Sequence, residues 1–281
     1  MAGGLGSTKA RAMDAAVYVF LIVVGVLFTV PLLWIVSTSF KTPGEIFTTP
    51  TTFLPQLPTT ENYRAIATGG FPYYLRNSLI AATGATLLGL VFCVPAAYGF
   101  AKFRYRSSGA LLSFAVLTRF FPPIALALPF FLQFRLIGLI DTPFGLAIAY
   151  VPIVFPLMIW ILEGFFSDYP DEILDAAKID GVGTIGTLLR IVVPTSLPAL
   201  GVATLFGFLV AWNEFIIALT LTRTPSGQTL PVGIAGLITQ FQTLWGQMMA
   251  VAVVYLLPVL AVTLIAQRGI VSGLMSGATR G

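Results

Sequence analysis

The hydrophobic positions of this chain lie in long blocks that short polar segments separate. Each block is long enough to cross the hydrocarbon core of a bilayer, which takes about 20 helical residues. We expect spans at about residues 15–36, 77–100, 110–134, 142–162, 199–221 and 247–266. The predicted fold class is therefore all-α: a polytopic membrane bundle of six transmembrane helices, forming a single domain over residues 1–281.

The third block contains a charge and a pair of prolines. Arg119 precedes Phe-Phe-Pro-Pro, which ends at Pro123. Paired prolines remove backbone donors, so we expect a broken helix whose freed groups are satisfied by neighbouring helices or by a water-lined cavity. A charge at this depth costs about 3 kcal/mol on insertion scales, so Arg119 should face the protein interior or water.

Three polar residues within the predicted spans could have either a structural role or a place on a solute path. Arg119 has either a structural role, paired with Glu214 or with carbonyls freed at Pro122, or a place on a solute path. Asn213 and Glu214, in the fifth block, are ambiguous for the same reason. Glycines at 84, 89, 201 and 207 most simply allow close contact between helices.

A polar stretch at residues 167–198 interrupts the apolar pattern and must lie in water. Pro170 suits a first helical position, Asp171 and Glu172 complement the positive end of the helix dipole, and Gly181 tolerates the left-handed conformation that ends a helix. We expect a helix there, running through Ile179. A second segment starts near Thr184 and carries an apolar stripe: Ile185, Leu188, Leu189 and Val192. We expect the first three of these to pack on the chain's own spans.

This stretch resembles the EAA loop of ABC importer permeases. The matching pattern is D-A-A-x-x-D-G from Asp175 to Gly181, then I-x-V-P ending at Pro194 and a further proline at Pro198; Asp175 stands where the family usually has a glutamate. In the family this loop forms a cytoplasmic coupling helix that docks on an ATPase subunit. The resemblance implies that the coupling residues are Glu172, Asp175, Ala176, Ala177, Asp180 and Gly181.

Four further segments are similar to the maltose-type carbohydrate branch: TRFFPP at 118–123, GLIDT at 138–142, WNEF at 212–215 and the tail QRGIVSGLMSGATRG at 267–281. The resemblance implies a non-catalytic permease subunit that pairs with a second permease, an ATPase dimer holding ATP and Mg, and an extracytoplasmic solute-binding protein. The implied solute is a carbohydrate or sugar-like polyol, with Arg119, Asn213 and Glu214 as path candidates.

A stand-alone secondary carrier or channel for a small polar solute is the alternative. Such carriers commonly show corresponding broken helices in two repeats, whereas here the sequence indicates a clear break in the third span alone. A carrier of that kind needs no ATPase partner.

Composition and charge narrow the function classes further. The chain is 57% hydrophobic and 9% charged, with a mean hydropathy of +0.93, far outside the range of soluble domains. It has no histidine and one cysteine, Cys93, which excludes His or Cys metal clusters. No phosphate-binding glycine loop is present, so the chain should bind no ATP itself, and no basic patch favours nucleic acid.

Basic residues predict the topology. With both termini inside, the cytoplasmic side of a bacterial or archaeal inner membrane holds nine, Lys9, Arg11, Lys102, Arg104, Arg106, Lys178, Arg190, Arg268 and Arg280, against five outside, Lys41, Arg64, Arg76, Arg135 and Arg223. This distribution follows the positive-inside tendency and places the 167–198 loop where ATP is available.

Overall fold

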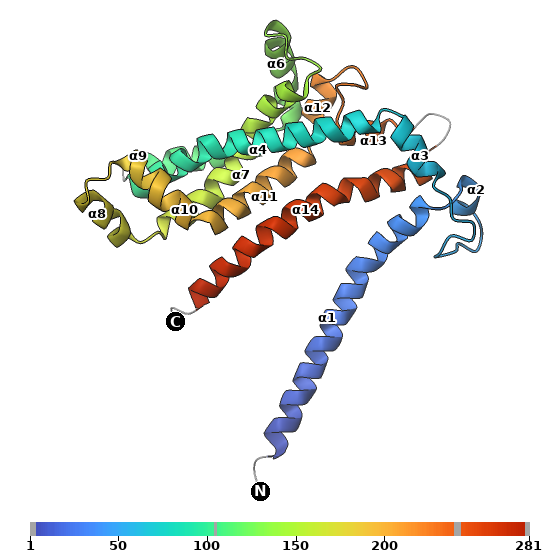
Figure 1. Ribbon diagram of the computed structural model, residues 1–281, viewed down its shortest axis with the longest axis horizontal. Helices are drawn as coiled ribbons and strands as arrows, with labels where there is room; N and C mark the ends of the chain where they lie inside the picture. The colour runs from blue at the N-terminus through green and yellow to red at the C-terminus, as the bar shows by residue number, and fades with distance from the viewer. Residues whose placement is uncertain (1–3, 104–105, 239–242, 279–281) are drawn as a thin grey trace. The chain divides into compact units, whose positions relative to one another are not determined.

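The computed structural model describes residues 4–103, 106–238 and 243–278 (Figure 1). Within these ranges the regular structure is helical and no named strand is present, which confirms the all-α fold class. The chain divides into two units, one made of residues up to Thr68 together with Leu237–Val254, the other of Gly69–Gly236 with the residues from Tyr255 onward.

The first unit contains α1 (Gly4–Ser39), α2 (Pro43–Ile46), α3 (Glu61–Thr68) and the first turns of α14 (Trp245–Ala278). Its polar segment after α1 is ordered by buried polar side chains. Lys41, only 1% exposed, donates from Nζ to the Thr52 carbonyl and lies 4.5 Å from the centre of the Trp34 ring. Asn62 donates from Nδ2 to the carbonyls of Ser39 and Lys41, at 2.9 Å each. These bonds satisfy backbone groups that a loop would otherwise leave unpaired.

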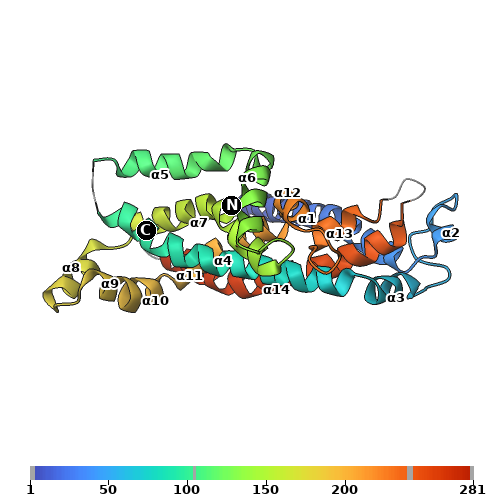
Figure 2. The same ribbon diagram turned by 90° about the horizontal axis from the view of Figure 1, so that it is seen from above.

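The core of the second unit is formed by α4 (Phe71–Lys102), α7 (Pro143–Ser167) and α11 (Leu197–Trp212), which lie side by side in both views (Figures 1 and 2). Small residues bring their backbones together. A Cβ atom at Gly84 would lie 2.8 Å from Ala147 Cβ, and Cβ atoms at Gly89 and Gly207 would lie 2.9 and 2.6 Å from Met158 Sδ. The expected close contact is therefore confirmed at these three glycines.

Gly201 differs from the other three glycines. The nearest atom to a Cβ at this position is the Ala266 carbonyl oxygen, at 3.9 Å. This is an ordinary contact, so the prediction of a close helix approach at Gly201 is wrong. The reason is its place on α11, where it lines an apolar groove together with Leu197, Leu200 and Ile265.

The broken helix predicted around Pro122 and Pro123 is confirmed. The chain forms α5 (Ser108–Leu117), a short 3-10 turn η1 (Thr118–Phe120) and then α6 (Pro123–Leu136), and the two parts are bent by 93° at the break. Figure 1 shows α6 turned away from the axes of α4 and α7. Pro123 occupies a first helical position, where its missing N–H removes no bond.

The predicted fifth span is also interrupted. α11 ends at Trp212, and α12 (Ile216–Leu221) begins after Asn213, Glu214 and Phe215. The expectation that the third span alone is broken is therefore wrong. The cause is Glu214, whose side chain caps the second helix and so makes a new helix start more favourable than continuation.

Four helices in the described ranges are long and apolar enough to cross a membrane: Met13–Ser39, Phe71–Lys102, Pro143–Ser167 and Trp245–Gln267. The number reaches six if each of two bent pairs is one span, Ser108–Phe120 with Pro123–Leu136 and Thr184–Thr195 with Leu197–Trp212. The expected count of six spans stays a prediction.

The segment between α12 and α13 (Leu230–Ala235) is fastened from two directions. Asn77, at the start of α4, donates from Nδ2 to the carbonyls of Ser226 (2.7 Å) and Gln228 (3.0 Å). Asp141, in the turn between α6 and α7, accepts from the amides of Arg223 (2.8 Å) and Thr224 (3.1 Å). α12 is thus held at both ends by carboxylates, Glu214 before it and Asp141 after it.

Candidate coupling site

The polar stretch predicted to carry the coupling residues forms α8 (Asp171–Ile179) and a tight turn. Gly181 has φ +75°, and its amide donates to the Lys178 carbonyl (3.0 Å) while the Val182 amide donates to the Ala177 carbonyl (2.9 Å). This pair of bonds is the Schellman motif, in which a left-handed glycine ends a helix and satisfies its last carbonyls. The predicted end at Gly181 is confirmed, but Pro170 is not the first helical residue: its backbone is extended (ψ 124°), it precedes the helix, and α8 begins one residue later at Asp171.

The implied coupling residues do not all lie on one side of α8. Glu172, Asp175, Ala176, Asp180 and Gly181 are exposed. Ala177 is 3% exposed and lies on the inner side, next to the buried Leu174. Five of the six residues can therefore meet another protein, whereas Ala177 contributes to packing within the chain.

The second segment is less regular than its sequence pattern indicates. It consists of α9 (Thr184–Thr187), a π-helical turn η2 (Leu188–Val192) and α10 (Val193–Thr195). Leu188 and Val192 are buried, but Ile185 and Leu189 are 74% and 59% exposed. The expectation that Ile185 and Leu189 pack on the chain's own helices is therefore wrong. The π-helical turn changes the angle between successive residues over Leu188–Val192, so Leu189 leaves the buried face of Leu188 and Val192; Ile185 precedes this turn, in the single-turn helix α9.

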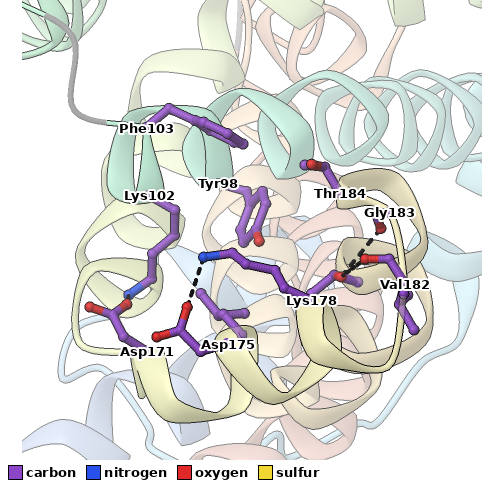
Figure 3. A pocket seen from close by; sticks show the side chains of 12 residues that line it. Tyr98, Lys102, Phe103, Asp171, Asp175, Lys178, Val182, Gly183 and Thr184 are labelled. Carbon is purple, nitrogen blue, oxygen red and sulfur yellow. Dashed lines mark hydrogen bonds and ion pairs between the residues drawn. The ribbon is translucent and has the colours of Figure 1, made fainter.

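The surface of α8 carries paired charges. Lys178 donates to Asp175 Oδ1 at 2.8 Å, one turn apart on the exposed side (Figure 3). This hydrogen bond, together with the carboxylate charge, raises the pKa of the Lys178 amine above its usual value. An exposed pair of this kind adds little stability. It does keep both side chains close to the helix surface.

Lys102, at the end of α4, is a site residue that the sequence did not single out. Its Nζ donates to the Tyr169 carbonyl and to Asp171 Oδ1, both at 2.7 Å, and its side chain is only 11% exposed. In the sequence Lys102 belongs to a basic cluster that we interpreted as a topology signal. Nothing in that cluster distinguishes a buried, bonded lysine from an exposed one.

A cavity of about 580 Å³ lies between the end of α4 and the α8–α9 turn (Figure 3). Tyr98, Lys102 and Phe103 line it on the α4 side. The opposite side consists of Asp171, Leu174, Asp175, Lys178, Gly181, Val182, Gly183, Thr184 and Thr187. The coupling stretch is therefore not packed tightly on α4 along its whole length.

The three path candidates do not form one cluster of bonded side chains. Arg119 is exposed in η1 and makes no ion pair or hydrogen bond with the described residues, so neither pairing considered for it is present. It lines a cavity of about 200 Å³ with residues of α7 and α11, among them Pro152 and Val210. Asn213 is exposed and accepts from the Tyr255 hydroxyl at 2.9 Å.

Glu214 is buried, with 8% of its surface exposed. Its carboxylate accepts from the Ile217 amide (2.9 and 3.1 Å) and from the Ala218 amide (3.0 Å). These donors are the otherwise unpaired amides of the first turn of α12. The charge therefore has a structural use that the sequence left open.

The fold of this chain is similar to that of a solved structure of known class. One match is the crystal structure of a bacterial ABC transporter involved in the import of the acidic polysaccharide alginate; its TM-score is 0.76 at 22% identity, over 92% of this chain and 97% of that one. The fold is that of an ABC importer permease.

Sequence comparison gives the family. The family model described as the binding-protein-dependent transport system inner membrane component matches residues 89–275. The trehalose transport system permease protein SugB of Mycobacterium tuberculosis is 36% identical, over 89% of this chain and 92% of that protein. The trehalose/maltose transport system permease protein MalG of Thermococcus litoralis is 34% identical, over 92% of this chain and 94% of that protein. The chain belongs to the family of inner membrane components of binding-protein-dependent transport systems.

Proposed function

We propose that this chain is the permease subunit of an ATP-driven importer for a carbohydrate or sugar-like solute, and that the α8 turn transmits the work of a partner ATPase. Family membership supports the permease role over a stand-alone carrier. The relatives named for trehalose and maltose support the solute class. The partners are a second permease, an ATPase dimer that binds ATP and Mg, and an extracytoplasmic solute-binding protein.

The observation that carries this proposal is the exposed end of α8. Asp180 and Gly181 form a tight, glycine-closed turn with Ala176 nearby, so the surface there has little bulk. Exposed Ile179, Ile185 and Leu189 lie in the same segment, and apolar groups of this size on a water-facing loop favour burial against another protein. Cytoplasmic termini, and therefore a cytoplasmic α8, are part of the proposal and follow from the basic-residue count.

The decisive variant is Gly181→Leu. A side chain at a left-handed position costs about 1–2 kcal/mol and adds bulk to the docking surface. We expect insertion into the membrane to persist, while copurification of the ATPase and ATP hydrolysis by the complex fall at least tenfold. The measurement is pull-down of the ATPase with the tagged permease, followed by a hydrolysis assay.

A matched control separates docking from general damage. Gly164→Leu adds the same side chain at an exposed position of α7 that has open space around it. This variant should behave as the unmodified complex does. Normal copurification and hydrolysis with Gly181→Leu would show that the α8 turn is not the coupling element.

We further propose that Arg119 and Asn213 lie on or beside the solute path, with Glu214 holding the backbone that presents Asn213. The support is their polarity at membrane depth and their exposure within the chain. Arg119→Ala should change the uptake rate or solute preference across a panel containing trehalose and maltose, with Arg135→Ala as the control. Uptake by Arg119→Ala at the unmodified rate for each solute transported would remove Arg119 from the path.

A further inference from the structure

The side-chain hydrogen bonds that join the start of α8 to other helices lie close together, while Leu174 and Ala177 are buried on its inner side. Lys102 reaches the start of α8 from the last residue of α4, through the 2.7 Å bonds to the Tyr169 carbonyl and to Asp171 Oδ1. The Tyr169 hydroxyl lies 2.8 Å from Thr195 Oγ1 of α10. Tyr169 is buried and the Lys102 side chain is only 11% exposed, so the bonds that Tyr169 makes are shielded from competing water, whereas the Asp171 side chain is 74% exposed. One residue, Tyr169, is thus fastened from α4 and from α10.

The other end of α8 is not fastened to α4. Among the described residues, no hydrogen bond or ion pair joins residues 178–184 to α4. Lys178 pairs with Asp175 inside its own helix, and Thr187 Oγ1 donates to the nearby carbonyls of Val182 or Gly183. The cavity of about 580 Å³ separates this end from Tyr98 and Phe103 (Figure 3).

Together, these two observations describe a helix that is bonded to α4 at its first turn and not at its last turn. A helix of nine residues is about 13 Å long, so a rotation about its first turn moves its last turn by several times as much as its first. The fixed end is the one that α4 holds, and the free end is the one with the exposed Asp180 and Gly181. The cavity provides the space into which the free end can move.

We propose that Lys102 is a positioning residue for coupling: it is the pivot about which α8 turns relative to α4, and it carries displacement of the α8 turn into α4. The proposal rests on the proposed function, because the displacement comes from the ATPase. Rigid elements joined at a fixed point convert a local shift into movement of a whole helix. Without the bonds from Lys102, α8 would move without displacing α4.

The test uses distances between pairs of spin labels in the purified complex with its second permease and ATPase. One pair, Gly99→Cys with Thr184→Cys, spans the cavity; the other, Gly99→Cys with Ile173→Cys, spans the pivot. The native Cys93 is buried and therefore accepts no label. Each distance is measured with ADP and with ATP plus vanadate.

In the unmodified complex we expect the 99–184 distance to change with nucleotide while the 99–173 distance stays constant. Lys102→Met keeps the apolar stem and loses both bonds, so the 99–173 distance should also become nucleotide-dependent. Lys102→Arg retains donors and should restore the constant distance. A role in folding alone would lower the yield of Lys102→Met without changing these distances.

Two results would overturn the pivot. One is an unmodified complex in which both distances change together; the other is a Lys102→Met complex whose distances match the unmodified ones. Tyr169→Phe loses only the bond to Thr195, so it should widen the 99–173 distance distribution less than Lys102→Met does. This variant provides the test if Lys102→Met does not assemble. Failure of the unmodified permease to retain the ATPase would instead contradict the proposed function.

Discussion

Two of the helix interruptions in the second unit are produced by different means. Between η1 and α6 the interruption is made by Pro122 and Pro123, with no side chain capping the new helix. Between α11 and α12 it is made by Glu214, whose carboxylate takes the amides of Ile217 and Ala218. Proline interrupts a helix without a partner residue, because proline itself has no backbone N–H to donate. A carboxylate break depends on a buried bond network and is lost when the side chain is removed.

The surroundings of the two breaks differ accordingly. Arg119, at the proline break, is exposed and unbonded among the described residues, whereas Glu214 is buried and fully engaged. A charge that is already satisfied by backbone amides is a poor candidate for direct solute contact. An exposed guanidinium is a better one, because at the membrane depth that we propose for Arg119 it must find water or a polar ligand.

The largest expected effect comes from Glu214→Ala. Removing the carboxylate leaves two amides of α12 without an acceptor, and each buried donor left unpaired costs about 1–3 kcal/mol. We expect a lower midpoint of thermal unfolding in detergent and a reduced yield of assembled complex. Glu214→Gln keeps one oxygen acceptor, so its unfolding midpoint and yield should fall clearly less than those of Glu214→Ala. Equal stability of the Ala variant and the unmodified protein would mean that the cap does not hold the break.

Replacing the prolines at the other break should change the angle between the two helices more than it changes the stability of the fold. Replacing Pro122 and Pro123 together by Ala removes the constraint that costs a continuous helix about 3 kcal/mol. The 93° bend should then open, and the distance between labels at Leu111→Cys and Leu132→Cys should approach the roughly 30 Å of a straight helix. Pro129→Ala, inside α6, is the control and should leave the distance unchanged. A bend that persists would show that contacts between α6 and α12 set it.

The smallest expected effect is at the far end of α12, and it depends on pH. Partial burial works to raise the pKa of the Asp141 carboxyl, but hydrogen bonds from the Thr224 hydroxyl and from the amides of Arg223 and Thr224 outweigh it, so the pKa lies below its usual value. A lowered pKa stabilises the fold above the unfolded value of about 3.9, and this contribution is lost as the pH falls through the folded value.

The measurement for Asp141 compares unfolding midpoints of the unmodified chain and Asp141→Asn between about pH 6 and pH 3. The difference between the two proteins should be present at the upper pH and shrink toward the lower one. A difference that does not change with pH would assign the effect of Asp141 to its shape, because only the charged form depends on pH.

How much the sequence could predict differs between these regions. Pro122 and Pro123 act through their own covalent structure, so the break at α6 was predictable, as was the end of α8 at Gly181; the start of α8, at Asp171, is one residue later than the sequence indicated. Glu214 acts through amides that it meets only in the folded chain, and the sequence could not distinguish a cap from a path residue. The buried side of a short segment depends on backbone details such as the π-helical turn, which is why Leu189 was misplaced.

The close packing of the core helices should protect the Met158 sulfur from oxidation. Its sulfur lies within 3 Å of the positions where Cβ atoms would stand on Gly89 and Gly207, and the side chain is fully buried. A sulfoxide oxygen has no room there, so peroxide should oxidise Met158 only when α4 and α11 separate from α7. Exposed Met13 supplies an internal reference for reagent dose. The ratio of the two sulfoxides, read by mass spectrometry, would time the opening of this core during transport without any added label.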